Sequence, residues 1–347
     1  MSDASDFLSC DWGTTSFRLR WVCGTDRSII REVREQAGVK ALYEQALVEG
    51  AFTEEERAGV FTRFLREKIA KLMAGETADP RHMSLVISGM ASSSVGWREL
   101  PYANTPFALD GKGLRFEEMK WNAPAWIGRT YLLSGVATPH DIMRGEELET
   151  IGLMSEPSLA SARAQCLLIL PGTHSKHVWI EHESVVDFRT WMTGELFTVM
   201  GKHSLLRASV DLDAPESASF SEDHRLAFQE GVLWAKQHGL AEGLFRVRTR
   251  SVLEQRPIPD NTAFFSGLLI GAELRHLLRL DGGDTRGDTS PVILGAAGRL
   301  SGFYAAALDI LLSESRPWQR VSSQQVERAT VAGHAIFLGS RHDSRDD

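Results

Sequence analysis

The residues best suited to chemistry in this sequence lie in two short segments rich in glycine, threonine and serine. The segments read Gly-Thr-Thr-Ser at residues 13–16 and Gly-Thr-His-Ser at residues 172–175. Each lies between two runs typical of β-strands, so each predicts a tight turn with backbone N–H groups and hydroxyls at close range. Such a turn suits the oxygens of a polyphosphate, whereas an ordinary hairpin explains either turn taken alone. Their matching placement favours a duplicated domain, with one triphosphate held by both turns.

Several carboxylates lie where they can serve these turns. Asp11 directly precedes the first turn, at the end of an apolar strand, and can hold Mg²⁺ there directly or through water; capping of the turn is the alternative. Asp141 and Glu146 are candidates for a general base, because they lie where the chain passes from its first half to its second. A cluster of Glu146, Glu147 and Glu149 at a helix start would otherwise only complement the helix dipole.

A third segment of interest is the small-residue run Leu-Gly-Ala-Ala-Gly-Arg-Leu at residues 294–300. It lies at a predicted junction of strand and helix, where a base or ribose can approach the backbone and a helix N-terminus can face phosphate. Gly295, Ala296 and Gly298 are therefore candidate nucleotide contacts. Close packing of the helix on the sheet explains the same residues equally well.

Other patterns have structural explanations. His174 and His177 would point to opposite faces of a predicted strand, which disfavours a metal site between them. Residues 245–250 alternate as a strand with three arginines on one face, which predicts a solvated edge rather than a nucleic-acid surface. Gly267 and Gly271, four residues apart on one face of a predicted helix, indicate tight helix packing.

Length and composition favour a two-domain globular protein. The 347 residues suffice for two α/β domains, each of roughly 150 to 180 residues, and hence for a cleft between them. Apolar residues make up 43% and charged residues 24% of the chain, close to the averages for globular proteins, which argues against a disordered or fibrous protein. The formal net charge of -8 argues against nucleic-acid binding, so any anion must be held by local positive groups.

Cysteine usage and the N-terminus favour a reducing compartment. Cys10, Cys23 and Cys166 form no CxxC pair, so neither a disulfide framework nor a zinc site is expected. The acidic N-terminal segment does not resemble a signal peptide, and no apolar stretch reaches the roughly 18 to 20 residues of a membrane span. We expect a cytoplasmic protein without membrane or nucleic-acid partners. Its oligomeric state stays open, and a homo-oligomer is compatible with the sequence.

Apolar periodicity predicts alternating strands and helices, with tight turns that make the first three strands antiparallel neighbours. Thr53 and Glu56 form a candidate capping box at one helix start. The predicted strands are 7–12, 16–22, 28–33, 84–89, 166–170, 177–181, 184–191, 245–250 and 291–295, and the predicted helices are 53–73, 143–154, 223–238, 262–280 and 299–312, with a turn-rich segment at 281–290.

The domain junction is placed near residue 141, because the strands that follow repeat the beginning of the chain. The first domain is expected at 1–140, joined by a C-terminal helix at about 330–347, and the second at 141–329.

Five segments in a fixed order resemble the sugar-kinase/Hsp70/actin superfamily. They are DWGTTSF, the RGEE segment, LPGTHSK, LGAAGRL and TVAGHAIFLG, which match phosphate 1, connect 1, phosphate 2, adenosine and connect 2. Within that superfamily, ISGMASSSVGWRELPY, DIMRGEELETIGL, LPGTHSKHVWI, FRTWMTGELF and FFSGLLIGAELR look like 2-dehydro-3-deoxygalactonokinases, over nearly the whole chain.

The resemblance implies a two-domain actin-like ATPase fold, which is a duplicated ribonuclease-H-like α/β fold with a central cleft. It also implies transfer of the γ-phosphoryl group of ATP, with Mg²⁺, to the 6-hydroxyl of 2-dehydro-3-deoxy-D-galactonate in galactonate degradation. The implied contacts are Asp11 for Mg²⁺, Gly13, Thr14, Thr15, Gly172, Thr173 and His174 for the phosphates, Gly295, Ala296 and Gly298 for the adenosine, Met90, Ser92, Ser93 and Trp97 for the polyol, and Arg98, Arg144 or Lys176 for the carboxylate.

One departure from the superfamily pattern affects the nucleotide contacts, because the adenosine segment reads GAAGR where many relatives have paired glycines. A kinase of another sugar or sugar acid is the alternative on the same fold, since one fold hosts many substrates. A non-catalytic ATP-binding regulator or chaperone is a further alternative. For the kinase we expect domain closure about residues 141–152 and 330–339, which would exclude water from the reaction.

Overall fold

The computed structural model describes residues 5–75, 83–121, 128–212, 222–278, 290–312 and 316–343. The chain divides into two compact units. Unit 1 comprises Met1–Ala160, Glu183–Val186 and Glu327–Asp347, and unit 2 comprises Ser161–His182 and Asp187–Val326. The junction near residue 141 that the sequence favours stays a prediction.

Unit 1 is built on a mixed sheet whose first strand, β1, lies in its interior. The strands of unit 1 are β1 (Phe7–Trp12), β2 (Phe17–Val22), β3 (Ile29–Glu35), β4 (Ser84–Gly89), β5 (Ala103–Asn104), β6 (Phe107–Ala108), β7 (Phe116–Glu118), β8 (Thr130–Leu133), β9 (Val136–Ala137) and β10 (Ile142–Met143). The main sheet has the order β3-β2-β1-β4-β8-β7, and β10-β9-β5 form a small second sheet. β1 runs antiparallel to β2 and parallel to β4. The first three strands are therefore antiparallel neighbours, as predicted.

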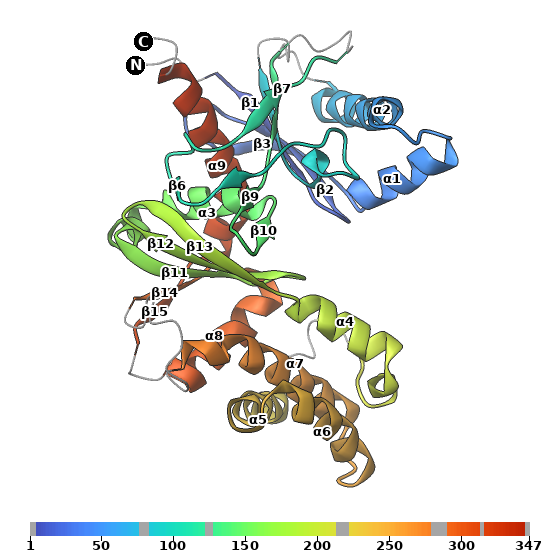
Figure 1. Ribbon diagram of the computed structural model, residues 1–347, viewed down its shortest axis with the longest axis vertical. Helices are drawn as coiled ribbons and strands as arrows, with labels where there is room; N and C mark the ends of the chain where they lie inside the picture. The colour runs from blue at the N-terminus through green and yellow to red at the C-terminus, as the bar shows by residue number, and fades with distance from the viewer. Residues whose placement is uncertain are drawn as a thin grey trace. The chain divides into compact units, whose positions relative to one another are not determined.

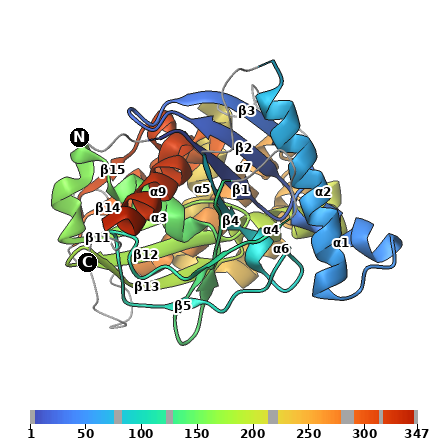
Figure 2. The same cartoon turned by 90° about the horizontal axis from the view of Figure 1, so that it is seen from above.

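Helices cover both faces of the main sheet of unit 1. They are α1 (Val39–Val48), α2 (Glu54–Met73), α3 (Glu146–Met154) and α9 (Ser323–Asp343), the last of which begins in unit 2. Figures 1 and 2 show α2 on one face and α9 on the other. Beneath α2, Trp12 packs edge-on against Phe17 with ring centroids 5.0 Å apart, and against Phe61 at 5.4 Å. Burial of this aromatic core holds α2 to the sheet beside the first glycine turn.

The start of α2 confirms the predicted capping box. The Glu56 carboxylate accepts hydrogen bonds from the backbone N–H groups of Thr53 and Phe52, both at 2.9 Å, and Thr53 Oγ1 accepts one from Glu56 N at 3.3 Å. Two backbone donors that the helix leaves unpaired are thereby satisfied.

A close crossing joins α3 and α9 within unit 1. A Cβ added to Gly152 would lie 1.8 Å from the carbonyl oxygen of Ala329, and one added to Gly333 would lie 2.2 Å from that of Leu148. Since real side chains do not approach backbone so closely, only glycine permits this crossing. The two segments resembling connect 1 and connect 2 are thus packed backbone to backbone.

Unit 2 repeats the strand order of unit 1. Its strands are β11 (Gln165–Leu170), β12 (Ser175–Glu181), β13 (Ser184–Trp191), β14 (Val292–Leu294) and β15 (Trp318–Arg320). The order β13-β12-β11-β14-β15 matches β3-β2-β1-β4-β8, with the first strand antiparallel to the second and parallel to the fourth in both. This correspondence is a structural duplication, as the two similar turns predicted. The β6 strand pairs with Ser184 and Val185, which belong to unit 1.

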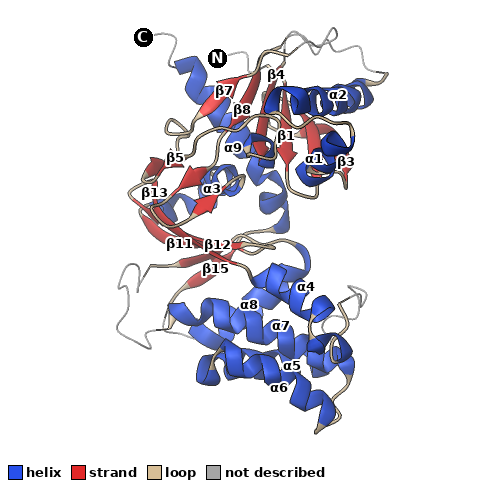
Figure 3. Cartoon of the chain, turned by 45° about the vertical axis from the view of Figure 1, so that its right-hand side comes forward, coloured by secondary structure: helices blue, strands red, loops and turns tan. Residues whose placement is uncertain are grey.

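The helices of unit 2 are α4 (Thr193–His203), α5 (Glu222–His238), α6 (Leu240–Val252), α7 (Ile258–Leu274) and α8 (Gly298–Leu312). They gather on one face of its sheet, as Figure 3 shows. The α5 and α7 helices approach closely, because a Cβ on Gly267 would lie 2.1 Å from the carbonyl oxygen of Phe228 and one on Gly271 would lie 2.8 Å from Val232 Cα. The tight packing predicted for this glycine pair is confirmed.

Two predictions of secondary structure were wrong. Residues 245–250 lie in α6 rather than in a strand, because Gly243, Val247 and Arg250 form a buried helical stripe, with Arg250 bonded to Glu230. Tertiary burial of every third or fourth residue outweighs the alternation in the sequence. Met143, predicted on the face of a helix, lies in β10. Residues 279–289, with most of the turn-rich segment at 281–290, lie outside the described residues.

Across the described ranges, no helix combines the length and the apolar character that crossing a membrane requires.

Candidate active site

The first glycine turn connects β1 to β2 and rests on the start of α1. Gly13 N donates to Ser16 O at 2.9 Å, which closes the turn, and Val39 N donates to Gly13 O at 3.0 Å. Gly38 lies against the turn, since a Cβ there would be 2.5 Å from the Thr14 backbone. Thr14, like its neighbour Thr15, is exposed. The turn therefore offers its middle residues to a ligand from a fixed backbone.

The second glycine turn, Gly172 to Ser175, is arranged in the same way at the start of α4. A Cβ on Gly194 would lie 2.6 Å from Gly172 O, and Glu195 N donates to Thr173 O at 3.1 Å. The middle residues Thr173 and His174 are exposed, and His174 Nε2 lies 2.5 Å from the Glu195 carboxylate.

Each turn is thus supported by a glycine at the beginning of the helix that follows the third strand. Gly38 and Gly194 were not predicted from the sequence as part of the site. The available signal was a glycine in both halves just after the third strand-like run. Because a side chain at either glycine would collide with the turn, these positions fix the shape of both turns.

Asp11 lies at the end of β1 beside the first turn, with 26% of its side chain exposed. Its carboxylate is 3.7 Å from a guanidinium nitrogen of Arg18. Burial raises the pKa of Asp11, and the carboxylate of Glu146 raises it further, while Arg18 and Arg20 lower it. Asp11 and Glu146, which the sequence predicted as a metal ligand and a candidate base, are therefore close enough to interact electrostatically.

Glu149 is a third carboxylate of this group, for which the sequence indicated no role beyond a place at a helix start. Burial raises its pKa to about 8, and the charges of Glu146 and Asp11 contribute. Its spacing three residues after Glu146 on α3 places both on one face of the helix. Glu147 differs, because its buried carboxylate accepts hydrogen bonds from Gly145 N at 2.9 and 2.7 Å and so supports the helix start.

Asp141 is engaged with its own loop. Its carboxylate accepts a hydrogen bond from Ile142 N at 2.7 Å, and its backbone N–H donates to Thr138 Oγ1 at 2.9 Å. Of the two predicted bases, Glu146 is the one whose charge acts on Asp11.

The predicted polyol-binding residues form a compact loop after β4, in which Met90 is half-buried. Ser92, Ser93 and Trp97 are buried. Ser92 Oγ donates to Gly89 O at 3.3 Å and Ser93 Oγ donates to Met90 O at 2.7 Å. These hydroxyls are bonded within the loop and define its shape.

The three cations predicted to meet the substrate carboxylate have different surroundings. Arg144, which lies between β10 and α3, donates to Ser92 O at 2.6 Å and lies 4.3 Å above the Tyr102 ring, so it joins the segment before α3 to the loop after β4. Arg98 forms ion pairs with Glu54 at 3.4 Å and with Glu117 at 3.3 Å.

Lys176 lies in unit 2 and is 4% exposed. Its ammonium donates to His174 O at 3.3 Å, which brings a positive charge to the second turn.

An apolar cavity of about 170 Å³ adjoins the second turn inside unit 2. The predicted adenosine segment borders it: β14 ends at Leu294, Gly295 and Ala296 are buried, and α8 begins at Gly298 with a φ of +58°. The cavity is lined by Gly172, Thr193, Gly194, Phe197, Ser266, Leu269, Ile270, Arg299, Leu300, Phe303 and Tyr304. An apolar cavity beside a phosphate-type turn suits a nucleobase and its sugar.

The residues at Asp11 suit a divalent cation shared with a substrate. Burial raises the pKa values of Asp11 and Glu149, the charge of Glu146 adds to both shifts, and a cation would relieve this repulsion. In the part of the chain that is described, no cluster of three or more His, Cys, Asp or Glu side chains is arranged to hold a metal ion. Mg²⁺ is typically bound by one or two carboxylates together with substrate phosphates, so Asp11 fits that manner of binding.

The duplicated sheets and their paired turns define a two-domain actin-like fold of the kind found in sugar kinases. The model of the family described as 2-keto-3-deoxy-galactonokinase matches residues 11–334. The chain therefore belongs to this kinase family.

Relatives and a solved structure agree with this assignment. The chain is 30% identical to the protein named "Probable 2-dehydro-3-deoxygalactonokinase DgoK1" from Rhizobium meliloti, over 97% of this chain and 99% of that protein. It is also 30% identical to the 2-dehydro-3-deoxygalactonokinase of Escherichia coli, over 78% of this chain and 80% of that protein. A crystal structure from Sinorhizobium meliloti, provisionally given the same enzyme name, has a TM-score of 0.73 at 27% identity and covers 95% of this chain and 97% of that one.

Proposed function

We propose that this protein transfers the γ-phosphoryl group of ATP to the 6-hydroxyl of 2-dehydro-3-deoxy-D-galactonate, giving the 6-phosphate and ADP. The observation that carries the proposal is the family match across residues 11–334, which includes both glycine turns and the carboxylates of α3. A cytoplasmic location and a role in galactonate degradation belong to the same proposal.

The two turns supply most of the proposed phosphate contacts. Gly13 to Thr15 and Gly172 to His174 each present exposed middle residues on a backbone fixed by a neighbouring helix. In phosphoryl transfer, catalysis comes mainly from positioning and from stabilising charge on the phosphoryl oxygens, and rigid donors do both. The cavity beside the second turn is the proposed place of the nucleoside. Arg299 and Leu300 line it, and Gly295, Ala296 and Gly298, which precede them in the chain, are the proposed adenosine contacts.

Asp11 is the proposed Mg²⁺ ligand, directly or through water. When bound, Mg²⁺ neutralises charge on the phosphates. Glu146 is the proposed base for the 6-hydroxyl proton, since its charge acts on Asp11. Like Asp141, it accepts a hydrogen bond from a neighbouring backbone N–H, that of Arg144, at 3.0 Å. With a pKa of about 8, Glu149 holds a proton at neutral pH and therefore adds little further negative charge.

The sugar acid is proposed to bind at the loop after β4. Met90, Ser92, Ser93 and Trp97 shape this loop, and Arg144 bonds to it, which makes Arg144 the favoured partner of the substrate carboxylate. Arg98 is occupied by two ion pairs, and Lys176 donates to the second turn.

A coupled assay of ADP release with Mg-ATP tests this proposal. The acceptors are 2-dehydro-3-deoxygalactonate, its gluconate epimer, galactonate and common hexoses, with a control lacking acceptor. We expect turnover with the galactonate-derived keto acid alone. Turnover with another acceptor would move the substrate to a different sugar acid, and nucleotide binding without any acceptor would favour a regulatory protein.

A further inference from the structure

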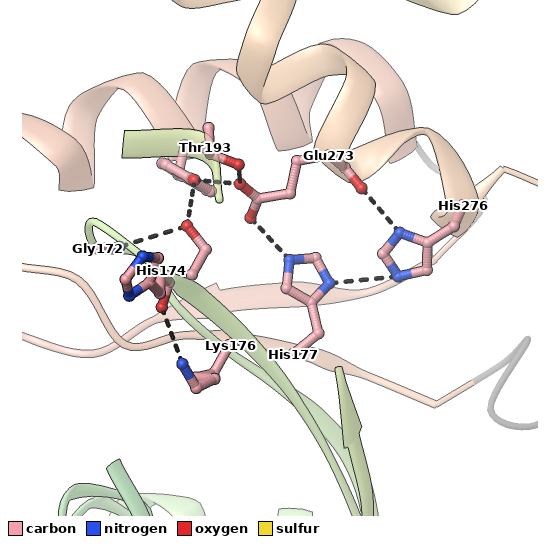
Figure 4. A network of polar contacts seen from close by, with 9 residues as sticks. Gly172, His174, Lys176, His177, Thr193, Glu273 and His276 are labelled. Carbon is pink, nitrogen blue, oxygen red and sulfur yellow. Dashed lines mark hydrogen bonds and ion pairs between the residues drawn. The ribbon is translucent and has the colours of Figure 1, made fainter. Parts of the chain in front are cut away.

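A buried carboxylate far from Asp11 in the sequence supports the second turn. Glu273 of α7 has a fully buried side chain. It accepts hydrogen bonds from Tyr304 OH at 2.6 Å and from Thr193 Oγ1, and it lies 2.8 Å from His177 Nε2. Figure 4 shows Glu273 between Thr193 and His177, close to the turn that carries Gly172 and His174. Each of these contacts connects to the turn or to its strand.

The first connection passes through Tyr304. Burial raises the pKa of the Tyr304 phenol well above its usual value, and the Glu273 carboxylate raises it further, so the phenol keeps its proton. Since Tyr304 donates that proton to Glu273, its oxygen accepts from Ser175 Oγ, 3.0 Å away. Ser175 Oγ in turn accepts from Gly172 N at 3.4 Å. These three hydrogen bonds therefore all donate in the same direction, from Gly172 N through Ser175 and Tyr304 to the Glu273 carboxylate.

The second connection passes through the start of α4. Thr193 is the first residue of that helix and donates to Glu273. The next residue, Gly194, lies against Gly172 O, and Glu195 N donates to Thr173 O at 3.1 Å. The Glu273 carboxylate thus holds the turn in two ways, through the start of α4 and through Tyr304.

The third connection fixes the strand that follows the turn. His276 Nδ1 lies 2.9 Å from the backbone carbonyl of Glu273, which only accepts, so Nδ1 carries the proton and a neutral His276 accepts at Nε2. His177 Nδ1, 3.2 Å from that Nε2, must then donate to it. Because His177 Nε2 also faces the Glu273 carboxylate, one proton is shared between His177 and Glu273. This sharing avoids an unpaired buried charge.

We propose that Glu273 is a positioning residue for phosphoryl transfer, which holds the Gly172–Ser175 turn in its phosphate-binding shape through Tyr304, Thr193 and His177. The inference rests on the proposed function for its catalytic consequence, and on the contacts of unit 2 for the anchoring itself. Glu273 acts on the turn through the residues it bonds, two of which, Thr193 and Tyr304, also line the cavity.

Two variants, one at Glu273 and one at Tyr304, test the anchor. A third variant, at another buried residue of α7, is the control. Glu273→Gln keeps the size of the side chain but removes its negative charge, so the hydrogen bonds from Tyr304 and Thr193 are no longer charge-assisted and weaken. Tyr304→Phe removes the hydrogen bonds of the phenol to Glu273 and to Ser175, and leaves the connections through Thr193 and His177 in place. Asn261→Ala removes a buried amide of α7 that bonds Arg250 and Val247 O, away from the turn.

Hydrogen exchange of the free protein measures the anchor without any substrate. We expect faster exchange at the backbone amides of residues 172–176 in Glu273→Gln and Tyr304→Phe, and unchanged exchange there in Asn261→Ala. Unchanged exchange at the turn in Glu273→Gln would overturn the inference. This readout stands even if the sugar-acid assay of the wild-type protein shows that the proposed function is wrong.

Kinetics then connect the anchor to catalysis. Displacement of catalytic groups by about 1 Å can cost about 10²-fold in rate, so we expect kcat of Glu273→Gln to fall by about 10- to 100-fold while the KM for the acceptor changes far less. Asn261→Ala should lower the melting temperature and leave kcat of the folded enzyme near that of wild type. Equal kcat in Glu273→Gln and Asn261→Ala, with a loosened turn, would show that the anchor does not serve the reaction.

Discussion

His334 of α9 makes a quantitative prediction for stability at low pH. Its ring is fully buried and lies between two strands, with Nδ1 2.8 Å from Ser9 Oγ of β1 and Nε2 3.0 Å from Ser88 Oγ of β4. Burial, with a contribution from the charge of Arg20, lowers its pKa from 6.5 to about 3. The folded protein therefore keeps His334 neutral at a pH at which the unfolded chain protonates it.

The sign of the effect follows from proton linkage. Between pH 6.5 and about 3 the unfolded state binds the additional proton, so stability falls as the pH falls below 6.5. Each unit of pH below the unfolded pKa costs about 1.4 kcal/mol, which gives about 2 kcal/mol at about pH 5 and almost nothing at about pH 7. Glu147 and Glu149, whose pKa values rise to about 8, act in the opposite direction, since they favour the folded state at low pH.

Comparison of variants isolates the histidine. The contributions of the glutamates are the same in wild type and in His334→Gln. We therefore expect the unfolding free energy of wild type minus that of His334→Gln to be about 2 kcal/mol smaller at about pH 5 than at about pH 7. Urea denaturation at the two pH values measures it, with the exposed His140 changed to Gln as a control that shows no such change. A difference between wild type and His334→Gln that is equal at both pH values would refute the assigned pKa.

Three further predictions concern the site and the α3–α9 crossing. Asp11→Asn should leave melting unchanged and lower kcat by several orders of magnitude, about 4 kcal/mol or more in activation free energy, and a near-normal rate in the coupled assay would contradict its role. Glu146→Gln should lower kcat by about 10²- to 10⁴-fold and Asp141→Asn far less; equal small losses would mean that neither is the base. Gly333→Ala should destabilise the fold by about 1 to 3 kcal/mol in thermal unfolding, whereas Gly339→Ala on the same helix, with nothing within 4 Å of its added Cβ, should not.

Local sequence determined most of the strands and helices. The alternation of apolar residues in β1, β2 and β3 and the capping box at Thr53 are local signals, so they could be read without knowledge of the tertiary contacts. The similar turns at Gly13 and Gly172 predicted the duplication, because the same turn requires the same flanking strands. The order of the five motifs along the chain identified the family, because that order can also be read without knowledge of the tertiary contacts.

Long-range packing decided what local signals missed. The alternating arginines of residues 245–250 read as a strand, but burial of Val247 and Arg250 against α5 and α7 makes them a helix. Glu149 looked like one of three equivalent glutamates, and only the proximity of α3 to Asp11 distinguishes it.

The sequence by itself therefore determined the fold family, the two glycine turns and the carboxylate beside the first, since each depends on residues close together in the chain. Tertiary structure alone decided what holds the turns in place. Gly38 and Gly194 matter because a Cβ there would collide with a distant backbone, and Glu273 matters because three donors from separate elements converge on it. Such convergence depends on contacts between residues 31, 80 and 96 positions apart, which no local pattern encodes.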